Sequence, residues 1–404
     1  MTRTVQVTVS FIGLAGLLVC GPGASAVLAQ PVHNLTQGTD HLTIQAAIDS
    51  AVAGDEIEVD PGTYVENIDF LDKDINVHST DPLDPTIVAG TIIDGGGGDT
   101  VVVLSAGTLS GFTITEGFSA QRAAGVYATG TAVVSHNVIT GNDGAWEGAG
   151  VTAKNTVVVS NNWITNNVAW IASGVHARDD SLVKNNYIAS NIAIAGAGGV
   201  RAREHSTIRN NTIVFNRALG LGPIGPFSGG GIYSQDSAVL LSNIVAFSGA
   251  RWGMVIASEN VTADYNCVFG NAGGDYLSDF GIGRHDLNVD PLLEEDNLHL
   301  TAASPCIDAG DPDLEPSAKE TDIDGEDRIL DGQVDIGCDE FAFCEGGANG
   351  DGNVDPLDSG FVLARFGCPV GTGDPSCDAA DQNGDGVVDP LDVGFVLARF
   401  GTCD

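Results

Sequence analysis

The chain of 404 residues contains 54 glycines, and its 54 acidic residues outnumber its 16 basic residues, for a formal net charge of −38. So few lysines and arginines argue against binding to nucleic acid or to an anionic membrane surface, whereas an acidic shell favours divalent cations. The length is too great for one compact core and suits a solenoid followed by a smaller module.

The N-terminal residues 1–29 have the features of a secretory signal peptide. A basic residue precedes an apolar run over residues 11–19, and small residues then offer cleavage after Ala26 or Ala29. A lipoprotein signal that ends at Cys20 is the alternative. Because no later stretch has eighteen uninterrupted apolar residues, we expect a secreted, extracellular or cell-surface protein without a membrane span.

Residues 30–285 are predicted to form the solenoid, which begins with a helical cap. Apolar residues recur with helical spacing between positions 44 and 51, and a strand-like stretch follows Gly54. The end of a solenoid exposes unpaired backbone and apolar core. We therefore expect a short amphipathic helix to cover the first rung.

The stretch from residue 125 to residue 271 repeats one pattern with a period near 24 to 25 residues. One column of asparagines recurs at steps of 25, 24, 25, 32 and 23 residues: Asn137, Asn162, Asn186, Asn211, Asn243 and Asn266. A glycine precedes each of the first five by twelve residues: Gly125, Gly150, Gly174, Gly199 and Gly231. Two apolar columns accompany them: Val134, Val159, Val183, Ile208 and Leu240, and then Ile139, Ile164, Ile188, Ile213 and Val245. Like residues that stack at the strand spacing of about 4.8 Å form one continuous core, so the pattern predicts a parallel β-helix.

The asparagine column is interpreted as a structural ladder. An asparagine tolerates the left-handed backbone of a sharp turn, and its amide can bond the copies above and below it. The longest step contains a Gly- and Pro-rich insertion over residues 217–230, which predicts a loop, and one more rung fits in front at Phe112 and Ile114. The columns resemble the right-handed parallel β-helices of the pectate-lyase-like superfamily over roughly residues 40 to 285.

That resemblance does not decide the activity, because the same fold serves lyases, hydrolases, esterases and inert adhesins. Charged residues follow the glycine column in two consecutive repeats: His176, Arg178, Asp179, Asp180, Arg201, Arg203, Glu204 and His205. A polysaccharide lyase needs a base that removes a proton beside a carboxylate and a cation that neutralises that carboxylate. A histidine of this cluster is the candidate base and an arginine is the candidate neutraliser. A salt-bridged exposed turn between rungs explains the same residues.

Aromatic side chains are the candidates for sugar binding. Trp146 and Trp170 lie four residues before their glycines, one repeat apart, and Trp163 and Tyr187 are spaced in the same way. Flat rings in line along a solenoid suit the apolar faces of sugar rings. Burial under the turn loops is the alternative interpretation.

Residues 286–343 interrupt the repeat and are interpreted as a capping segment. They resemble the closing segment of secreted β-helix proteins from environmental bacteria. The residues that carry this match are Asp322, Asp324, Gly325, Arg328, Asp335, Gly337 and Glu340. Asp322 and Asp324 with Asp327 form either a cation site or a solvated acidic turn.

Residues 344–404 contain two loops with the spacing of EF-hand-type calcium sites. In the second loop, residues with oxygen ligands stand at positions 1, 3, 5, 7, 9 and 12: Asp381, Asn383, Asp385, Val387, Asp389 and Asp392. The corresponding residues of the first loop are Asn349, Asp351, Asn353, Asp355 and Asp358, with a glycine at position 1. Calcium takes six to eight oxygens, so we expect two Ca²⁺ sites, the first weaker because one carboxylate is missing.

The two loops continue into the same sequence, which predicts two equivalent helices. Their matched apolar residues are Phe361, Leu363 and Phe366, and Phe395, Leu397 and Phe400. A duplicated calcium loop with its helix resembles a type I dockerin over residues 345 to 402. The resemblance implies a cohesin-like or cell-surface partner, although Pro-Leu at loop positions 10 and 11 departs from the family pattern.

Seven cysteines follow the predicted signal peptide, and six of them lie beyond residue 300. An oxidising compartment favours disulfides among them. Cys267 takes a strand position of the repeat and is predicted to be a free thiol. Cys368 with Cys403, and Cys344 with Cys377, are candidate pairs, while the connectivity stays open.

These features give two functional hypotheses. In the first, the chain binds or degrades extracellular polysaccharide, as a lyase or glycoside hydrolase if it is an enzyme, and is anchored through its dockerin-like tail. In the second, it is a non-catalytic adhesive or structural surface protein whose regular rungs present an acidic face. A concave groove at the charged cluster favours catalysis, and a convex turn with paired charges favours adhesion.

Overall fold

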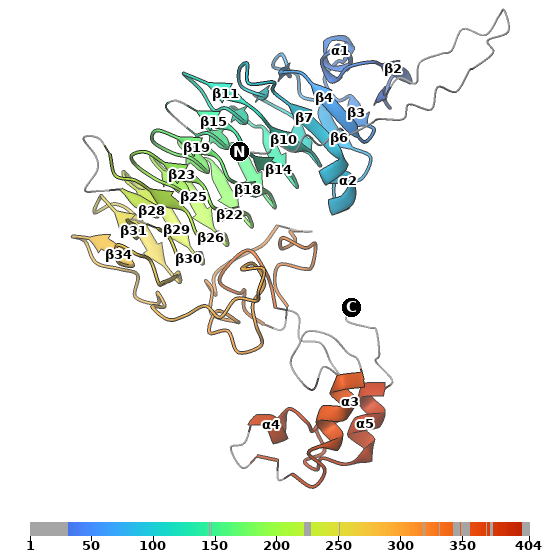
Figure 1. Cartoon of the computed structure of the whole chain (residues 1–404), viewed down its shortest axis with the longest axis vertical. Helices are drawn as coiled ribbons and strands as arrows, with labels where there is room; N and C mark the ends of the chain where they lie inside the picture. Colours follow the sequence, from blue (N-terminus) through green and yellow to red (C-terminus); the bar gives the residue numbers. More distant parts are fainter. Residues whose placement is uncertain are drawn as a thin grey trace, which may run out of the picture.

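The computed structural model describes residues 31–144, 146, 148–221, 228–249, 251–317, 320–330, 332–341, 348, 356–368, 370–371 and 375–397. The predicted signal peptide lies outside the described residues. Most of the described strands are short and stack in four sheets that share one axis (Figure 1). Among the described residues, no helix is both long and apolar enough to cross a membrane.

Each turn of the chain contributes strands to the sheets in the same order. Sheet A consists of β2 (Thr39–His41), β1 (Val32–Asn34), β3 (Glu56–Val59), β6 (Asn76–Ser79), β9 (Thr108–Ser110), β13 (Val133–Ser135), β17 (Val158–Ser160), β21 (Leu182–Lys184), β25 (Thr207–Arg209), β29 (Val239–Leu241) and β32 (Thr262–Asp264). Sheet B consists of β4 (Gly62–Val65), β7 (Thr91–Asp94), β10 (Thr113–Thr115), β14 (Val138–Thr140), β18 (Trp163–Thr165), β22 (Tyr187–Ala189), β26 (Thr212–Val214), β30 (Ile244–Ala246) and β33 (Cys267–Phe269). Sheet C consists of β5 (Ile68–Asp69), β8 (Val102–Leu104), β12 (Val126–Ala128), β16 (Val151–Ala153), β20 (Val175–Ala177), β24 (Val200–Ala202), β28 (Gly229–Ser234), β31 (Trp252–Ile256) and β34 (Tyr276–Ser278). Sheet D consists of β11 (Phe118–Ser119), β15 (Asp143–Gly144), β19 (Val168–Ala169), β23 (Ile192–Ala193) and β27 (Arg217–Ala218).

Strand pairing confirms the predicted parallel solenoid. Neighbouring strands pair in parallel, except where β1 pairs antiparallel with β2 and β3. The predicted apolar columns are in register, with Val134 opposite Val159 and Ile139 opposite Ile164, and the additional front rung places Ile114 opposite Ile139. The predicted loop over residues 217–230 is shorter than expected, because β27 and β28 occupy its two ends.

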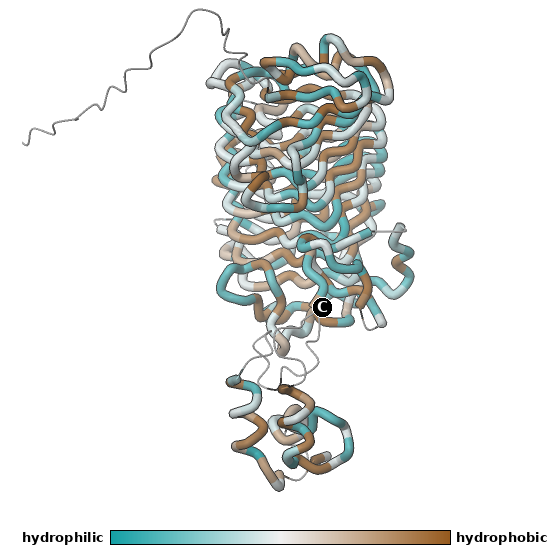
Figure 2. The backbone as a smooth tube through the Cα atoms, turned by 90° about the vertical axis from the view of Figure 1, so that its right-hand side faces the viewer, coloured by the Kyte–Doolittle hydropathy of each residue, from teal (hydrophilic) through white to brown (hydrophobic). Residues whose placement is uncertain are grey.

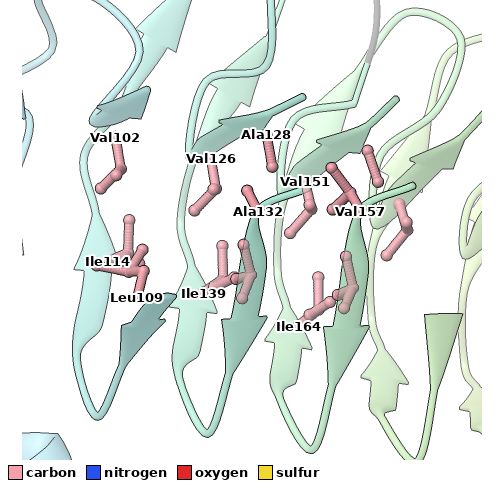
Figure 3. Packing of buried hydrophobic residues seen from close by; sticks show 14 of the residues in the cluster. Val102, Leu109, Ile114, Val126, Ala128, Ala132, Ile139, Val151, Val157 and Ile164 are labelled. Carbon is pink, nitrogen blue, oxygen red and sulfur yellow. The ribbon is translucent and has the colours of Figure 1, made fainter. Parts of the chain in front are cut away.

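The core consists of columns of like residues that run along the axis. Figure 3 shows Ile114, Ile139 and Ile164 in one row from left to right in successive rungs, facing the row of Val102, Val126 and Val151. The same columns appear as bands of apolar residues along the tube in Figure 2. Because each rung buries its apolar side chains only against the rungs above and below, stability is expected to come from nearest-neighbour stacking.

The asparagine column forms the predicted hydrogen-bonded ladder. The Nδ2 group of Asn162 donates to Oδ1 of Asn186 at 3.0 Å, and the backbone N–H of Asn162 donates to the same oxygen at 3.0 Å. The expected left-handed conformation belongs instead to the residue before each asparagine, with φ between 51° and 59° at His136, Asn161, Asn185, Asn210, Ser242 and Tyr265. The ladder asparagine therefore supplies the hydrogen bonds of the turn, while the residue before it adopts the left-handed conformation that bends the chain.

A second asparagine ladder, which the sequence analysis did not recognise, lies five residues after the first. Its hydrogen-bonded members are Asn142, Asn167, Asn191 and Asn216. Both ladders end on a carboxylate, since Oδ1 of Asp286 accepts from the N–H of Asn266 at 2.8 Å and Oδ1 of Asp275 accepts from that of Asn271 at 3.0 Å. An aspartate ends a ladder well because it accepts hydrogen bonds without needing a further acceptor.

The helix α1 (Ile44–Ser50) is the predicted N-terminal cap. Thr43 caps its first turn by accepting from the N–H of Ala46, and the helix buries Ile44, Ala47 and Ile48 in the solenoid core. A second helix, α2 (Pro85–Gly90), was not predicted. The sequence at its N-terminus is nevertheless typical of a helix start, because Asp84 caps the helix and proline occupies its first position.

Residues 286–341, called the flanking segment below, lie beside the solenoid (Figure 1). Their apolar side chains pack on the outer face of sheet B: Leu298, Leu300, Ile336 and Cys338 contact the cluster that contains Tyr187, Val214, Ile244 and Cys267. The segment predicted as a cap therefore covers the outer face of sheet B with most of its apolar side chains. The physical reason is that sheet B is apolar on both faces from β22 to β33, and its outer face needs a cover.

The C-terminal residues form α3 (Pro356–Leu363), α4 (Pro375–Asp378) and α5 (Pro390–Leu397), and α3 packs against α5. The buried apolar residues of these two helices are Val362 and Val396, with Phe361 packed against them, whereas the predicted Leu363 and Leu397 are exposed. Phe400 lies outside the described residues.

The cysteine pairs differ from both candidates. Cys368 bonds to Cys377, which excludes the pairs Cys368–Cys403 and Cys344–Cys377. Cys267 is a buried free thiol, as predicted, but Cys306 and Cys338 are free as well. Burial in the apolar contact between the flanking segment and sheet B accounts for all three, because free cysteine packs as a small apolar residue.

Candidate functional site

A pocket of about 390 Å³ lies on the outer face of sheet B, between α2 and the flanking segment. Its lining residues come from three parts of the chain: Pro82, Leu83, Pro85 and Val88; His136, Asn137, Val138, Asn161 and Trp163; and Ile323, Asp324 and Gly325. Strands β14 and β18 form the floor, and the two walls are segments that do not belong to the repeat. A largely apolar pocket with a few polar groups has the usual composition of a small-ligand site.

Trp163 is the aromatic residue of this floor. Its side chain is 38% exposed, and its ring lies 4.9 Å from the ring of Tyr187 on the next strand. Tyr187 is only 8% exposed because the flanking segment covers it, and burial raises its pKa to about 12. Of the predicted pair of sugar-binding rings, only Trp163 is therefore accessible to a ligand, and the buried ring of Tyr187 packs beside it.

The wall formed by residues 323–325 is held by the buried carboxylate of Asp322. Its Oδ1 accepts from the backbone N–H groups of Asp324, Gly325 and Glu326 at 2.9 to 3.0 Å. Its Oδ2 accepts from the N–H of Glu340 at 3.1 Å, and burial raises the pKa of Asp322. Asp322 is therefore not part of a solvated acidic turn, because it is buried and both of its oxygens bind backbone donors, whereas a cation site with Asp324 and Asp327 stays a prediction.

Glu320 attaches this wall to the solenoid. Its carboxylate lies 2.6 Å from Nζ of Lys184 and 2.8 Å from Nη2 of Arg209, on strands β21 and β25, and all three side chains are largely buried. The pKa of Glu320 falls to about 2, because these two cations outweigh the opposing effect of burial. Burial lowers the pKa of Lys184 as well, but two cations around one carboxylate still favour the ionised trio.

The other residues of the closing-segment motif stabilise the fold of the flanking segment. Arg328 is fully buried, donates to the carbonyls of Asp335 and Gly337 at 3.0 and 2.9 Å, and lies 3.4 Å from Glu340. Burial raises the pKa of Asp335 to about 6 and that of Glu340 to about 8. The motif residues that resemble the closing segment of other proteins therefore make buried hydrogen bonds within the flanking segment.

The predicted catalytic cluster lies on sheet C, away from this pocket. His176 is paired between Thr152 and Arg201 in the strand ladder and is fully buried, so a polymer has no access to it in this conformation. Arg201 lies with its guanidinium 5.9 Å from the ring centre of Tyr233. The structure thus argues against His176 as the base.

The remaining charges of the cluster are paired in the turns after β20 and β24. Arg178 lies 3.2 Å from Glu204, and Arg203 lies 3.4 Å from Asp236. Asp179 accepts from the backbone N–H of Asn155 at 2.9 Å, while His205 lies 3.7 Å from Asp180 at the surface. This arrangement is the salt-bridged turn that the sequence left as an alternative. Residues 222–227, which belong to the nearby loop, lie outside the described residues.

Trp146 and Trp170 form a separate aromatic pair. Their rings meet edge to face with centres 6.3 Å apart, and both are substantially exposed. They precede β16 and β20 of sheet C, whereas Trp163 lies on sheet B. The four predicted aromatic residues therefore do not form one surface.

The second predicted calcium loop has its oxygen-bearing side chains turned inward. Asp392 is fully buried, and its oxygens accept from the N–H groups of Asn383 at 3.0 Å and Asp389 at 2.8 Å. Asp381 accepts from the N–H groups of Asp385 at 3.1 Å and Gly386 at 2.8 Å.

The sharp bends of this loop occur at Gly384 and Gly386, with φ of 70° and 85°. The residue types and spacing suit a calcium ion, which takes oxygen ligands from one such loop, and calcium binding here stays a prediction. In the first loop, Asp358 is also fully buried. The other predicted ligands, Asn349, Asp351, Asn353 and Asp355, lie outside the described residues.

Comparisons with known proteins do not help to interpret this site. The chain is similar to the crystal structure of pectate lyase Pel9A, with 14% sequence identity and a TM-score of 0.32 over 74% of this chain and 91% of that chain. A likeness at this level supports no argument about activity, and the solenoid is established by the strand pairing. No family model matches the chain, and no curated protein matches it.

The sequence analysis identified Trp163 but missed the pocket around it. One wall carried a readable signal, since Asp84 followed by Pro85 is a typical helix start. The other wall had none, because nothing in the local sequence of residues 323–325 says which part of the solenoid they will contact.

Proposed function

We propose that this chain is an exported β-solenoid that binds polysaccharide at the pocket over Trp163, and that a calcium-binding dockerin-like tail anchors it. The observation that carries the sugar-binding part is the exposed ring of Trp163 on the floor of an apolar pocket between two fixed walls. Such a ring stacks against the apolar face of a sugar, and a pocket of this volume holds one or two sugar residues.

The pocket favours uncharged sugars over uronates. The described lining residues include Asp324 but no lysine or arginine. A uronate carboxylate therefore meets a like charge and no basic side chain among these lining residues. Hydrogen bonds to sugar hydroxyls are available from His136, whose pKa is lowered by burial so that its imidazole is neutral near pH 7.

Replacing Trp163 with alanine tests this proposal. The variant is expected to bind a neutral polysaccharide at least about tenfold more weakly, because the main apolar contact is lost. Affinity electrophoresis through gels that contain neutral or uronate polysaccharides measures the change. Trp146→Ala is the matched control, because Trp146 is also exposed and also packs against a neighbouring ring.

Two results contradict the proposal. One is a wild-type protein that no polysaccharide retards, which favours the alternative of a non-catalytic adhesive or structural protein. The other is equal retardation of wild type and Trp163→Ala with unchanged thermal unfolding. The paired charges of the sheet C turns already favour a non-catalytic surface at that place.

The tail is tested by calcium titration of the full chain after chelation, followed by calorimetry. Two unequal sites are expected, because the first loop lacks the carboxylate at position 1. Asp392→Ala is expected to remove the tighter site and Asp358→Ala the weaker one, while the exposed Asp313→Ala leaves both unchanged. Retention of both sites in Asp392→Ala contradicts the proposed calcium role, and with it the dockerin-like anchoring to a cohesin-like or cell-surface partner.

A further inference from the structure

Three metal-ligating side chains of the flanking segment meet at the rim of the pocket. One ligand atom each from His299, Asp324 and Asp339 lies within 4.8 Å of the other two. The three residues are widely separated in sequence, and the fold of the flanking segment brings them together. Asp324 belongs both to this cluster and to the pocket wall, so the cluster opens toward the pocket.

The imidazole of His299 is oriented in the way that metal-binding histidines usually are. Its Nδ1 is hydrogen-bonded to Oδ2 of Asp296, and its Nε2 lies 2.7 Å from Oδ2 of Asp324. A carboxylate that accepts the Nδ1 proton fixes the ring and directs Nε2 at the ion. Nε2 and Oδ2 of Asp324 therefore face each other as two ligand atoms between which a cation could bind.

Asp339 supplies a buried carboxylate that protein donors do not satisfy. It is 5% exposed, and among the described residues it accepts one hydrogen bond, from the N–H of Leu300 to Oδ2 at 2.8 Å. Its Oδ1 therefore has no hydrogen-bond donor in the described part of the chain. This oxygen is therefore available as a ligand for a cation.

The surrounding charge also favours a cation. Three carboxylates, of Asp296, Asp324 and Asp339, face one histidine, so the group keeps a negative charge even when the imidazole is protonated. The nearest arginine of the segment, Arg328, is engaged with Glu340 and backbone carbonyls.

We propose that His299, Asp324 and Asp339 bind a divalent first-row transition metal ion such as Zn²⁺. The histidine nitrogen separates this site from the calcium loops, because Ca²⁺ and Mg²⁺ prefer oxygen ligands alone. Zinc bonds of about 2.0 to 2.2 Å place tetrahedral ligand atoms roughly 3.4 Å apart. The three side chains need only small rotations to reach that spacing.

The remaining coordination position faces the pocket, because Asp324 lines it. We assign that position to water or to a hydroxyl of the bound sugar. This last assignment rests on the proposed sugar binding, whereas the metal site itself does not. A metal that holds one hydroxyl would fix the orientation of the sugar ring over Trp163.

Zn²⁺ titration of the full chain, with the tail saturated by Ca²⁺, tests the site. Wild type is expected to bind one Zn²⁺ that excess Ca²⁺ does not displace, and His299→Ala and Asp339→Asn are expected to lose it. Asp296→Asn is expected to weaken binding about 10- to 100-fold, which is usual for the partner of a ligating histidine. His285→Ala is the matched control, because His285 is also half-exposed and also paired with an aspartate, Asp264.

The visible absorption spectrum of the Co²⁺-loaded protein gives a second readout, because histidine and carboxylate ligation change its bands. Equal Zn²⁺ binding by wild type and His299→Ala overturns the proposal and indicates adventitious binding at surface histidines. Absence of Zn²⁺ binding by the wild type also overturns it. Loss of Zn²⁺ binding in His299→Ala with unchanged retardation by polysaccharide keeps the metal site and refutes its link to the sugar. Thermal unfolding of each variant shows whether the fold is retained.

Discussion

Asn186→Ala is expected to lower the free energy of unfolding of the solenoid by at least about 4 kcal/mol. The amide of Asn186 donates to the carbonyls of Val159 and Lys184 at 2.9 and 2.7 Å and to Oδ1 of Asn211 at 3.0 Å. Its own Oδ1 accepts from the backbone and side-chain nitrogens of Asn162, both at 3.0 Å. Alanine removes these contacts, in which the two amide protons serve three acceptors. The carbonyls of Val159 and Lys184 and the backbone N–H of Asn162 lose this partner, which costs about 1 to 3 kcal/mol per group before any relaxation. The Oδ1 atom of Asn211 keeps the backbone N–H at position 186 as a donor.

Chemical denaturation followed by circular dichroism measures this loss. Asn260→Ala is the control, since Asn260 is exposed and its side chain makes no hydrogen bond among the described residues. The control is expected to stay within about 0.5 kcal/mol of wild type. If the two variants have similar midpoints, the ladder does not hold the rungs together, and the apolar columns alone account for the stability of the solenoid.

Glu320→Gln is expected to release the flanking segment from the solenoid. Loss of the carboxylate leaves Lys184 and Arg209 close together and largely buried without a counter-charge, which costs about 3 to 5 kcal/mol. The segment then loses its charged attachment and keeps the hydrogen bonds of Asn161 and Asn185 to the carbonyl of Thr321, so the wall of the pocket at residues 323–325 is expected to loosen. Hydrogen–deuterium exchange of residues 320–341 measures this detachment, and faster exchange is expected there than in the strands of sheet A.

The ion pairs of Glu320 also predict that the attachment of the flanking segment depends on pH. The pKa of Glu320 falls from its usual 4.5 to about 2 in the folded chain. Its contribution to stability is therefore fully present above pH 4.5 and is lost as the pH falls toward about 2. Wild type is expected to lose protection of the flanking segment over this window, while Glu320→Gln is expected to exchange rapidly at every pH.

Glu315→Gln is the matched control for Glu320→Gln. Glu315 lies in the same segment but is exposed, so its charge interacts mainly with solvent. It is expected to exchange like wild type. Unchanged protection of residues 320–341 in Glu320→Gln would show that the apolar contacts of Leu298, Leu300 and Ile336 suffice to hold the segment.

The repeat of the sequence determined the solenoid and its register. Each rung repeats the same short apolar runs, so residues one period apart, such as Val134 and Val159, pair wherever the rungs stack. The ladder of Asn137 and its successors follows from the same regularity, because every copy finds an identical partner above and below it. These contacts depend on local sequence and on the nearest neighbour alone, which is why a single sequence predicts them.

The tertiary structure alone decided where the residues without a period lie. The flanking segment lies on sheet B because that outer face is apolar, whereas the sequence identified it only as a capping segment without a place on the solenoid. This placement buries Tyr187, makes Trp163 the floor of a pocket, and brings His299, Asp324 and Asp339 together. These contacts join residues of the flanking segment to residues of sheet B that are not related by the repeat. They depend on how well the two surfaces fit together and how much of each is buried. The sequence therefore predicts the scaffold, while the candidate site depends on how the non-repeating segments pack against it.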